Sequence, residues 1–237
     1  MLIAFIKDLF NNSLRPDMKI SKMKLGSFFL TCGLMLTAHA GYAENLPKVS
    51  LKTNMGEIVI ELHPEAAPKT VENFLKYVKS GHYKGTVFHR VIDNFMIQGG
   101  GYDKDLKEKS VGKPIPSEAR HALENGLKND LGTIAMARTE DPNSATAQFY
   151  INVKDNDFLN HQILADGDPV EFTYRGNSVT EPRAKALKMT AGYTPFGKVI
   201  QGMDVVEKIK VLETGESKMM QNVPNKPVII QSATLLK

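Results

Sequence analysis

Residues 87–101 read VFHRVIDNFMIQGGG, and this stretch decides the fold class. Two runs of β-forming residues, VFHRVI and FMIQ, flank an Asp-Asn turn signal and lead into three glycines. That pattern predicts a β-hairpin directed into a core. Arg90 alternates with Phe88 and Ile92, so a permanent cation is expected among large apolar side chains. Such a cation needs either a structural partner or a function.

The rest of the chain adds short strands and few helices. Apolar residues at helical spacing predict helices over 66–81 and 203–212, and the polar stretch 102–131 is expected to form long surface loops. Further strand-like runs complete the pattern: 49–62, 132–138, 147–153, 196–202 and 227–236. About eight short strands without βαβ alternation predict a mainly β protein, an antiparallel barrel or sandwich whose open ends the two helices would cap.

Residues 1–43 have the layout of a secretory signal peptide. Three lysines precede the apolar run 25–36 (LGSFFLTCGLML), and the small-residue run TAHAGYA ends at Ala43. The apolar run is too short to span a bilayer comfortably. A basic region, an apolar region and an A-x-A-like site predict cleavage near Ala43 and a periplasmic or secreted location for 44–237. The alternative is an uncleaved anchor.

Charge and composition exclude several classes of function for the expected mature chain, residues 44–237. The whole chain carries a formal charge of +4, of which residues 1–43 contribute +3, so about +1 remains. No electrostatic case for nucleic acid follows from that charge. The one cysteine, Cys32, lies in the expected signal peptide, which excludes thiol catalysis and disulfides after cleavage.

No familiar cofactor or metal motif is present. The chain has no Walker loop, no G-x-S-x-G and no H-E-x-x-H, and its 6 histidines are scattered without metal-ligand spacing. Neither a cofactor nor a metal is therefore expected. The glycines at 99–101 precede no predicted helix, which favours a closely packed turn over a phosphate-binding loop.

One arginine and two amides remain as candidate functional groups among apolar residues. Gln98 shares a strand face with Met96, and Gln148 shares one with Tyr150. An apolar floor beside the always-charged, five-donor fork of Arg90 suits a neutral substrate whose polarity changes in the transition state. The alternative is a structural arginine paired with an acid on the barrel wall.

Three long motifs resemble the cyclophilin-type peptidyl-prolyl cis–trans isomerases, most closely the exported bacterial branch. They are VFHRVIDNFMIQGGG, GTIAMARTEDPNSATAQFYINVKDNDFL and FGKVIQGMDVVEKI. The resemblance covers about 49–160 and 193–236. It implies an eight-stranded antiparallel β-barrel capped by two α-helices, which agrees with the strand count made from periodicity alone.

The resemblance also implies roles for individual residues. The F-H-R motif makes Arg90 the catalytic arginine. The residues implied to bind substrate follow from the other matched motifs: Phe95, Met96, Gln98, Ala137, Arg138, Thr139, Gln148, Tyr150, Phe158, Leu159 and Tyr193. His89 is expected to be structural. Phe158 stands where animal members often carry Trp, and Arg138 stands where they often carry Asn.

The largest departure from the family pattern is an insertion at about 161–192. Shorter relatives join its ends with a brief loop, and its Thr180-Glu181-Pro182 run is suited to start a short helix. A tolerated surface insertion is one interpretation, because barrels accept long loops cheaply. A lid or partner contact beside the substrate groove is the other.

The resemblance implies an enzyme that accelerates rotation of X-Pro bonds during folding of exported proteins. Its expected partners are proline-containing unfolded or folding polypeptides. We expect a monomer without nucleic-acid binding and without stable membrane association after cleavage. The alternative is a cyclophilin-fold binding module or chaperone with little isomerase activity.

Overall fold

The computed structural model describes residues 46–237, and the predicted signal peptide lies outside the described residues. Eight strands form one antiparallel sheet in the order β12-β1-β2-β9-β5-β6-β4-β3. Their bounds are, in that order, Ile230–Leu235, Lys48–Thr53, Gly56–Leu62, Pro195–Gln201, Thr133–Met136, Phe149–Asn152, Met96–Asp103 and Thr86–Ile92.

The two edges of this sheet meet, so the sheet is nearly closed into a barrel. Val87 of β3 forms an isolated antiparallel bridge with Ile229. The backbone N–H of Phe88 donates to the carbonyl of Val228 at 3.0 Å. Near closure leaves few unpaired backbone groups at the sheet edges. The predicted eight-stranded antiparallel barrel is confirmed.

Two amphipathic helices pack against the barrel as expected. Helix α1 (Pro68–Lys79) buries a face that includes Phe74, and α4 (Met203–Lys210) buries a face that includes Val206. Both side chains belong to the main hydrophobic core, together with residues of all eight barrel strands. Phe74 meets the Phe149 ring edge-on, with centroids 5.8 Å apart, a favoured aromatic geometry.

The described residues contain two α-helices besides the two that cap the barrel. Helix α2 (Ala119–Glu124) lies within 102–131, which the sequence analysis assigned to loops. It has six residues and buries only two alanines, so it offers too few apolar positions for a periodic signal. Helix α3 (Arg183–Met189) begins directly after Pro182, where the sequence suggested a short helix.

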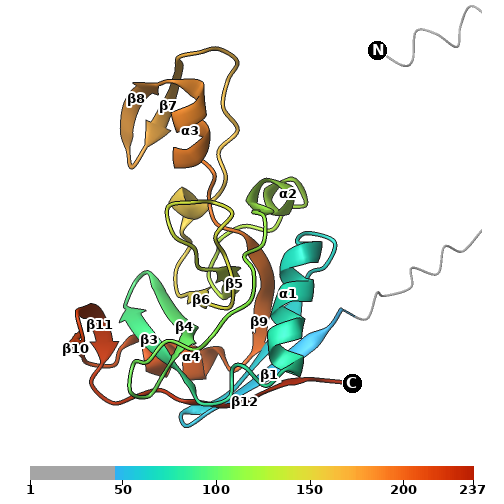
Figure 1. The fold of residues 1–237 in the computed structure, drawn as a ribbon, viewed down its shortest axis with the longest axis vertical. Helices are drawn as coiled ribbons and strands as arrows, with labels where there is room; N and C mark the ends of the chain where they lie inside the picture. The colour runs from blue at the N-terminus through green and yellow to red at the C-terminus, as the bar shows by residue number, and fades with distance from the viewer. Residues whose placement is uncertain (1–45) are drawn as a thin grey trace, which may run out of the picture. The chain divides into compact units, whose positions relative to one another are not determined.

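Two additional hairpins lie outside the barrel sheet (Figure 1). Strands β7 (Val170–Tyr174) and β8 (Asn177–Glu181) belong to the insertion and lie beside α3. Strands β10 (Thr214–Ser217) and β11 (Met220–Pro224) form the other hairpin, which lies close to β3. Both hairpins were absent from the sequence prediction. Within residues 46–237 no helix is long and apolar enough to cross a membrane.

Candidate active site

A line of polar side chains crosses three neighbouring barrel strands. Strand β3 places Arg90 opposite Gln98 of β4, and β4 pairs with β6, which follows Gln148. Nη1 of Arg90 donates to Oε1 of Gln98 at 3.3 Å, and Nε2 of Gln98 donates to Oε1 of Gln148 at 3.0 Å. The arginine is therefore held by a neutral amide chain.

Within residues 46–237 the charge of Arg90 has no carboxylate partner. None of the ion pairs between residues of the described part of the chain involves it. The side chain is half-buried, and this burial lowers the pKa of its guanidinium below the usual value without removing the charge. A structural arginine paired with an acid on the barrel wall is therefore contradicted, and the other N–H donors of the fork remain available to a ligand.

The triple glycine explains how Gln148 reaches this line. The three glycines lie within β4, as a closely packed backbone and not as a helix entry. A Cβ on Gly101 would stand 2.5 Å from Cγ of Gln148, and one on Gly100, whose φ is +86°, would stand 2.9 Å from the Tyr83 ring. Glycine is needed because the Gln148 side chain packs directly on the β4 backbone.

A small apolar cluster lies beside the polar line and is separate from the main core. Its buried members are Met96, Ala135, Tyr150 and Leu159, and the partly buried members are Ile92, Phe95, Ala137 and Tyr193. The Arg90 guanidinium carbon is 6.0 Å from the centre of the Phe95 ring. The cluster therefore supplies an apolar floor next to the free guanidinium donors.

Two further predicted residues stand at the rim of this floor. Phe158 stacks on Phe95 with ring centroids 5.7 Å apart and 24° between the planes, yet 62% of Phe158 is exposed. Arg138 lies over the Tyr193 ring at 4.3 Å, and its Nε donates to the carbonyl of Gly192 at 2.9 Å. The structure therefore gathers the predicted residues around Arg90, with one exception.

Thr139 is that exception. Its side chain is exposed and its hydroxyl is 2.8 Å from Oγ of Ser144, while its carbonyl accepts from Nη1 of Arg138 at 2.9 Å. Thr139 has no place in the apolar cluster. Its connection to the site runs through Arg138.

A buried network of asparagines supports the floor from beneath, and the sequence analysis missed it. The Tyr150 hydroxyl donates to Oδ1 of Asn129 at 2.8 Å, and Asn129 also contacts Asn152. Asn156 donates from Nδ2 to Asn152 Oδ1 and to the Phe95 carbonyl, both at 2.8 Å. Asn129 and Asn152 are 0% exposed. Asparagines are common in loops, so only their burial marks them as positioning residues.

The tip of the β10–β11 hairpin bounds the site on the Arg90 side. Met219–Asn222 line a hollow of about 440 Å³ together with Arg90, Gln98 and Gln148. Met219 is fully exposed at this tip. The hairpin therefore forms a wall of the groove that contains the arginine.

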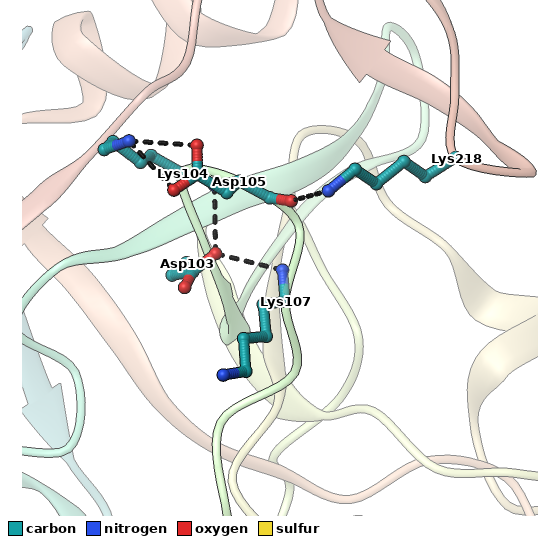
Figure 2. Close-up of polar contacts among 5 residues, drawn as sticks. All are labelled: Asp103, Lys104, Asp105, Lys107 and Lys218. Atoms are coloured by element: carbon teal, nitrogen blue, oxygen red, sulfur yellow. Dashed lines mark hydrogen bonds and ion pairs between the residues drawn. The ribbon is translucent and has the colours of Figure 1, made fainter.

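Lys218 ties this hairpin to the loop after β4 (Figure 2). Its ammonium donates to the carbonyl of Asp105. Oδ1 of Asp103 accepts from the backbone N–H groups of Asp105 and Lys107, each at 2.9 Å, and Lys104 pairs with the Asp105 carboxylate at 2.9 Å. The bond from the Lys107 N–H is the main cause that lowers the pKa of Asp103. These contacts within the loop hold the Asp105 carbonyl where Lys218 can donate to it.

His89, next to Arg90 in β3, lines the same hollow as the arginine. It is 5% exposed, packs edge-on against Tyr102 at 4.7 Å, and its Nδ1 has no hydrogen-bond partner among residues 46–237. Burial lowers the pKa of His89 to about 4. The imidazole is therefore neutral near pH 7. Within the described residues, no group of three His, Cys, Asp or Glu side chains is suited to hold a metal ion.

The structure is thus a nearly closed antiparallel barrel in which Arg90, without an acid partner among residues 46–237, lies beside an apolar floor. The family model "Cyclophilin type peptidyl-prolyl cis-trans isomerase/CLD" matches residues 48–235. The chain belongs to this family of peptidyl-prolyl cis-trans isomerases.

Curated relatives agree with that assignment. The chain is 52% identical over 188 residues to peptidyl-prolyl cis-trans isomerase cyp18 of Streptomyces antibioticus, covering 79% of this chain and 98% of the relative. It is 48% identical over 187 residues to peptidyl-prolyl cis-trans isomerase B of Escherichia coli K12, with coverage of 79% and 98%. The crystal structure of a Cryptosporidium parvum cyclophilin-type isomerase matches with a TM-score of 0.56 at 24% identity, covering 81% of this chain and 98% of that chain.

Proposed function

We propose that this isomerase lowers the barrier to X-Pro rotation through a hydrogen bond from Arg90 to the prolyl nitrogen. Amide resonance sets that barrier at about 18–20 kcal/mol. As the bond twists, resonance is lost and the nitrogen gains a usable lone pair. A guanidinium N–H bonds the twisted state better than the planar one, which is differential binding of the transition state.

The observation that carries this proposal is that Arg90, at the edge of an apolar floor, pairs with a neutral amide and with no acid among residues 46–237. In the proposed mechanism the proline ring lies on Phe95, Met96 and Tyr150, and water is displaced from around the bond. The donor from Arg90 then acts in a medium of lower dielectric constant, where it is worth more. Rotation breaks no covalent bond, so it requires no nucleophile, metal or proton acceptor.

The amide line gives the substrate a second anchor in this proposal. Nε2 of Gln148, whose Oε1 accepts from Gln98, donates to the carbonyl before the proline, and Gln98 keeps Arg90 aimed along the floor. The substrate class is a polypeptide with an accessible X-Pro bond. In support, one structure of the Cryptosporidium cyclophilin was determined in the presence of the dipeptide Ala-Pro.

We further propose that the enzyme acts on exported proteins outside the cytoplasm. The support is the basic, apolar and small-residue order within residues 1–43. N-terminal sequencing of the protein recovered from the cell envelope is expected to begin near Glu44. A product that starts at residue 1 and stays in the membrane fraction would contradict the export proposal and leave the isomerase proposal untouched.

A protease-coupled assay on proline tetrapeptides tests the catalytic proposal. Spontaneous cis-to-trans conversion takes tens of seconds or longer. The mature chain is expected to accelerate it far above this spontaneous rate. Binding of the same peptides without acceleration would favour the alternative of a binding module.

A further inference from the structure

The insertion is a folded unit with a fixed base beside the apolar floor. At its base the N–H of Tyr193 donates to the Leu159 carbonyl at 2.9 Å, and the N–H of Gln162 donates to the Thr190 carbonyl at 3.0 Å. Gly192 has φ +69°, and a Cβ there would stand 2.4 Å from the backbone nitrogen of His161. The two ends of the insertion therefore meet at Leu159 and Tyr193, which both belong to the floor.

A small hydrophobic core gives the insertion its own shape. Val170, Phe172 and Ala186 are buried there, and Leu164, Tyr174, Val179 and Met189 pack around them. Strands β7 and β8 pair in register up to Tyr174 and Asn177, so Arg175 and Gly176 form a two-residue turn. Their φ values of +51° and +83° are those of a type I′ hairpin turn. The turn presents Arg175 at the tip of the hairpin.

This tip faces the exposed rim residue of the substrate groove. A pocket of about 570 Å³ is lined by Phe158, Gln162, Thr173, Arg175 and Gly176. Its apolar wall is the same Phe158 ring that stacks on Phe95. The pocket thus adjoins the floor beside Arg90, because Phe158 lines the pocket and stacks on Phe95 of the floor.

The guanidinium of Arg175, at the tip of the hairpin, is available to a ligand. Among the described residues the Arg175 guanidinium forms no ion pair or hydrogen bond, and its central carbon lies 5.3 Å from the centre of the Tyr174 ring. The side chain is exposed. An unpaired guanidinium above an apolar wall attracts a carboxylate that follows or precedes an apolar side chain.

We propose that this pocket is an extension of the substrate groove that binds an extended segment of the substrate chain bearing an aromatic or aliphatic side chain next to an acidic one. The proposal rests on the proposed function, because it takes the X-Pro bond to lie over Arg90 and Phe95. The apolar side chain packs on Phe158, and the carboxylate meets Arg175.

The distances between Arg90, Phe95 and Phe158 determine how far from the proline a substrate residue must lie to enter the pocket. Arg90 to Phe95 is 6.0 Å and Phe95 to Phe158 is 5.7 Å, and each corresponds to about two residues of an extended chain. The pocket therefore receives a side chain roughly three to four residues from the proline. Proline tetrapeptides are too short to occupy it, whereas unfolded proteins are not.

Cis–trans exchange measured by NMR on peptides of three kinds tests the proposal. One is a proline tetrapeptide, and the other two carry Phe-Asp or Phe-Lys three to four residues from the proline, each made with the pair before and after it. The proteins are the wild type, Arg175→Glu and the control Lys188→Glu, which makes the same charge change on exposed α3. With the pair on one side of the proline, either before or after it, wild-type kcat/KM is expected to be about 5-fold higher for the Phe-Asp peptide than for the Phe-Lys peptide. This is the effect of one favourable ion pair.

Arg175→Glu is expected to abolish or reverse this preference through KM while tetrapeptide turnover stays unchanged, and Lys188→Glu to retain it. Equal kcat/KM for the Phe-Asp and Phe-Lys peptides in the wild type would overturn the proposal. So would equal effects of the two substitutions. An inactive wild type on the tetrapeptide would instead count against the proposed function, because the tetrapeptide does not reach the pocket.

Discussion

Arg90 donates a 3.3 Å hydrogen bond to Gln98, and this neutral amide is its partner where the barrel wall offers no carboxylate. A carboxylate in that place would hold the guanidinium more strongly and cancel its charge. An amide orients the fork and leaves its charge intact. The relationship therefore suits a side chain that must act on a ligand.

Removal of the arginine tests this interpretation first. We expect Arg90→Ala to lower kcat/KM on proline tetrapeptides by about 10²–10³-fold, the effect of losing one preorganised donor. The Arg90 side chain is half-buried and forms no ion pair with an acid among residues 46–237, so the variant is expected to fold. Circular dichroism and thermal unfolding alongside the isomerase assay provide the check.

The matched control is Arg120→Ala, which removes an exposed arginine that pairs with Glu124 four residues on. It should leave both activity and melting temperature nearly unchanged. An Arg90→Ala protein that is folded and fully active would contradict the catalytic role. One that fails to fold would show that the arginine is structural.

A second prediction concerns the partner rather than the arginine. Gln98→Glu places a carboxylate where Oε1 now accepts from Arg90, and we expect kcat/KM to fall roughly 10-fold as the donor charge is neutralised. The substitution keeps the size of the side chain, so packing is preserved. Gln201→Glu, at an exposed position of β9, adds the same charge away from the site. If both variants kept wild-type kcat/KM, a neutral partner would not matter for catalysis.

The sequence predicted the barrel well because its strands are short, alternating and separated by clear turn signals. The hairpin of β3 and β4 runs as the Asp-Asn signal indicated, and Arg90 lies opposite Gln98. The apolar floor was also predicted, since Phe95, Met96 and Tyr150 sit in motifs of the resembling family. Local pattern and family motif thus agreed on the same residues.

Contacts between distant parts of the chain were beyond the sequence. Glu118 accepts from the backbone N–H groups of Lys69 and Thr70, at 3.1 and 2.8 Å, and so caps α1 from far along the chain. Asn129 similarly reaches Tyr150 and Asn160. The sequence alone does not reveal such long-range hydrogen bonds, because exposed Glu and Asn are common in loops. Only the three-dimensional arrangement reveals the partner.

A third prediction separates the ring of Tyr150 from its hydroxyl. The ring belongs to the floor, whereas the hydroxyl donates to buried Asn129. We expect Tyr150→Phe to keep kcat/KM within about 3-fold and to lower the free energy of unfolding by about 1 kcal/mol, the net value of one hydrogen bond. Urea unfolding and the tetrapeptide assay measure the two effects.

Tyr150→Ala serves as the contrasting variant, because it removes the ring as well. It should raise KM strongly, since the proline would lose part of its apolar surface. A Tyr150→Phe protein that lost most of its activity would show that the hydroxyl, and not the ring, serves the substrate.

The last prediction follows from the buried His89, the neighbour of Arg90 in β3. His89 is 5% exposed, its Nδ1 has no hydrogen-bond partner in the described part of the chain, and burial lowers its pKa from 6.5 to about 4. The folded protein therefore resists protonation of His89 while the unfolded chain accepts a proton below about pH 6.5. Stability from this residue is fully present above pH 6.5 and is lost as the pH falls toward 4. A shift of this size corresponds to about 3 kcal/mol of unfolding free energy.

Replacement of His89 by Phe keeps an aromatic ring against Tyr102 and removes the titrating group. We expect wild-type stability to decline between pH 7 and 4 more steeply than that of His89→Phe, by up to about 3 kcal/mol over the range. His82, whose pKa burial also lowers, is present in both proteins, so the difference isolates His89. Urea unfolding at half-unit pH steps supplies the curves. Parallel curves would mean that His89 is protonated equally easily in the folded and unfolded states, and its burial would then carry no pH-dependent cost.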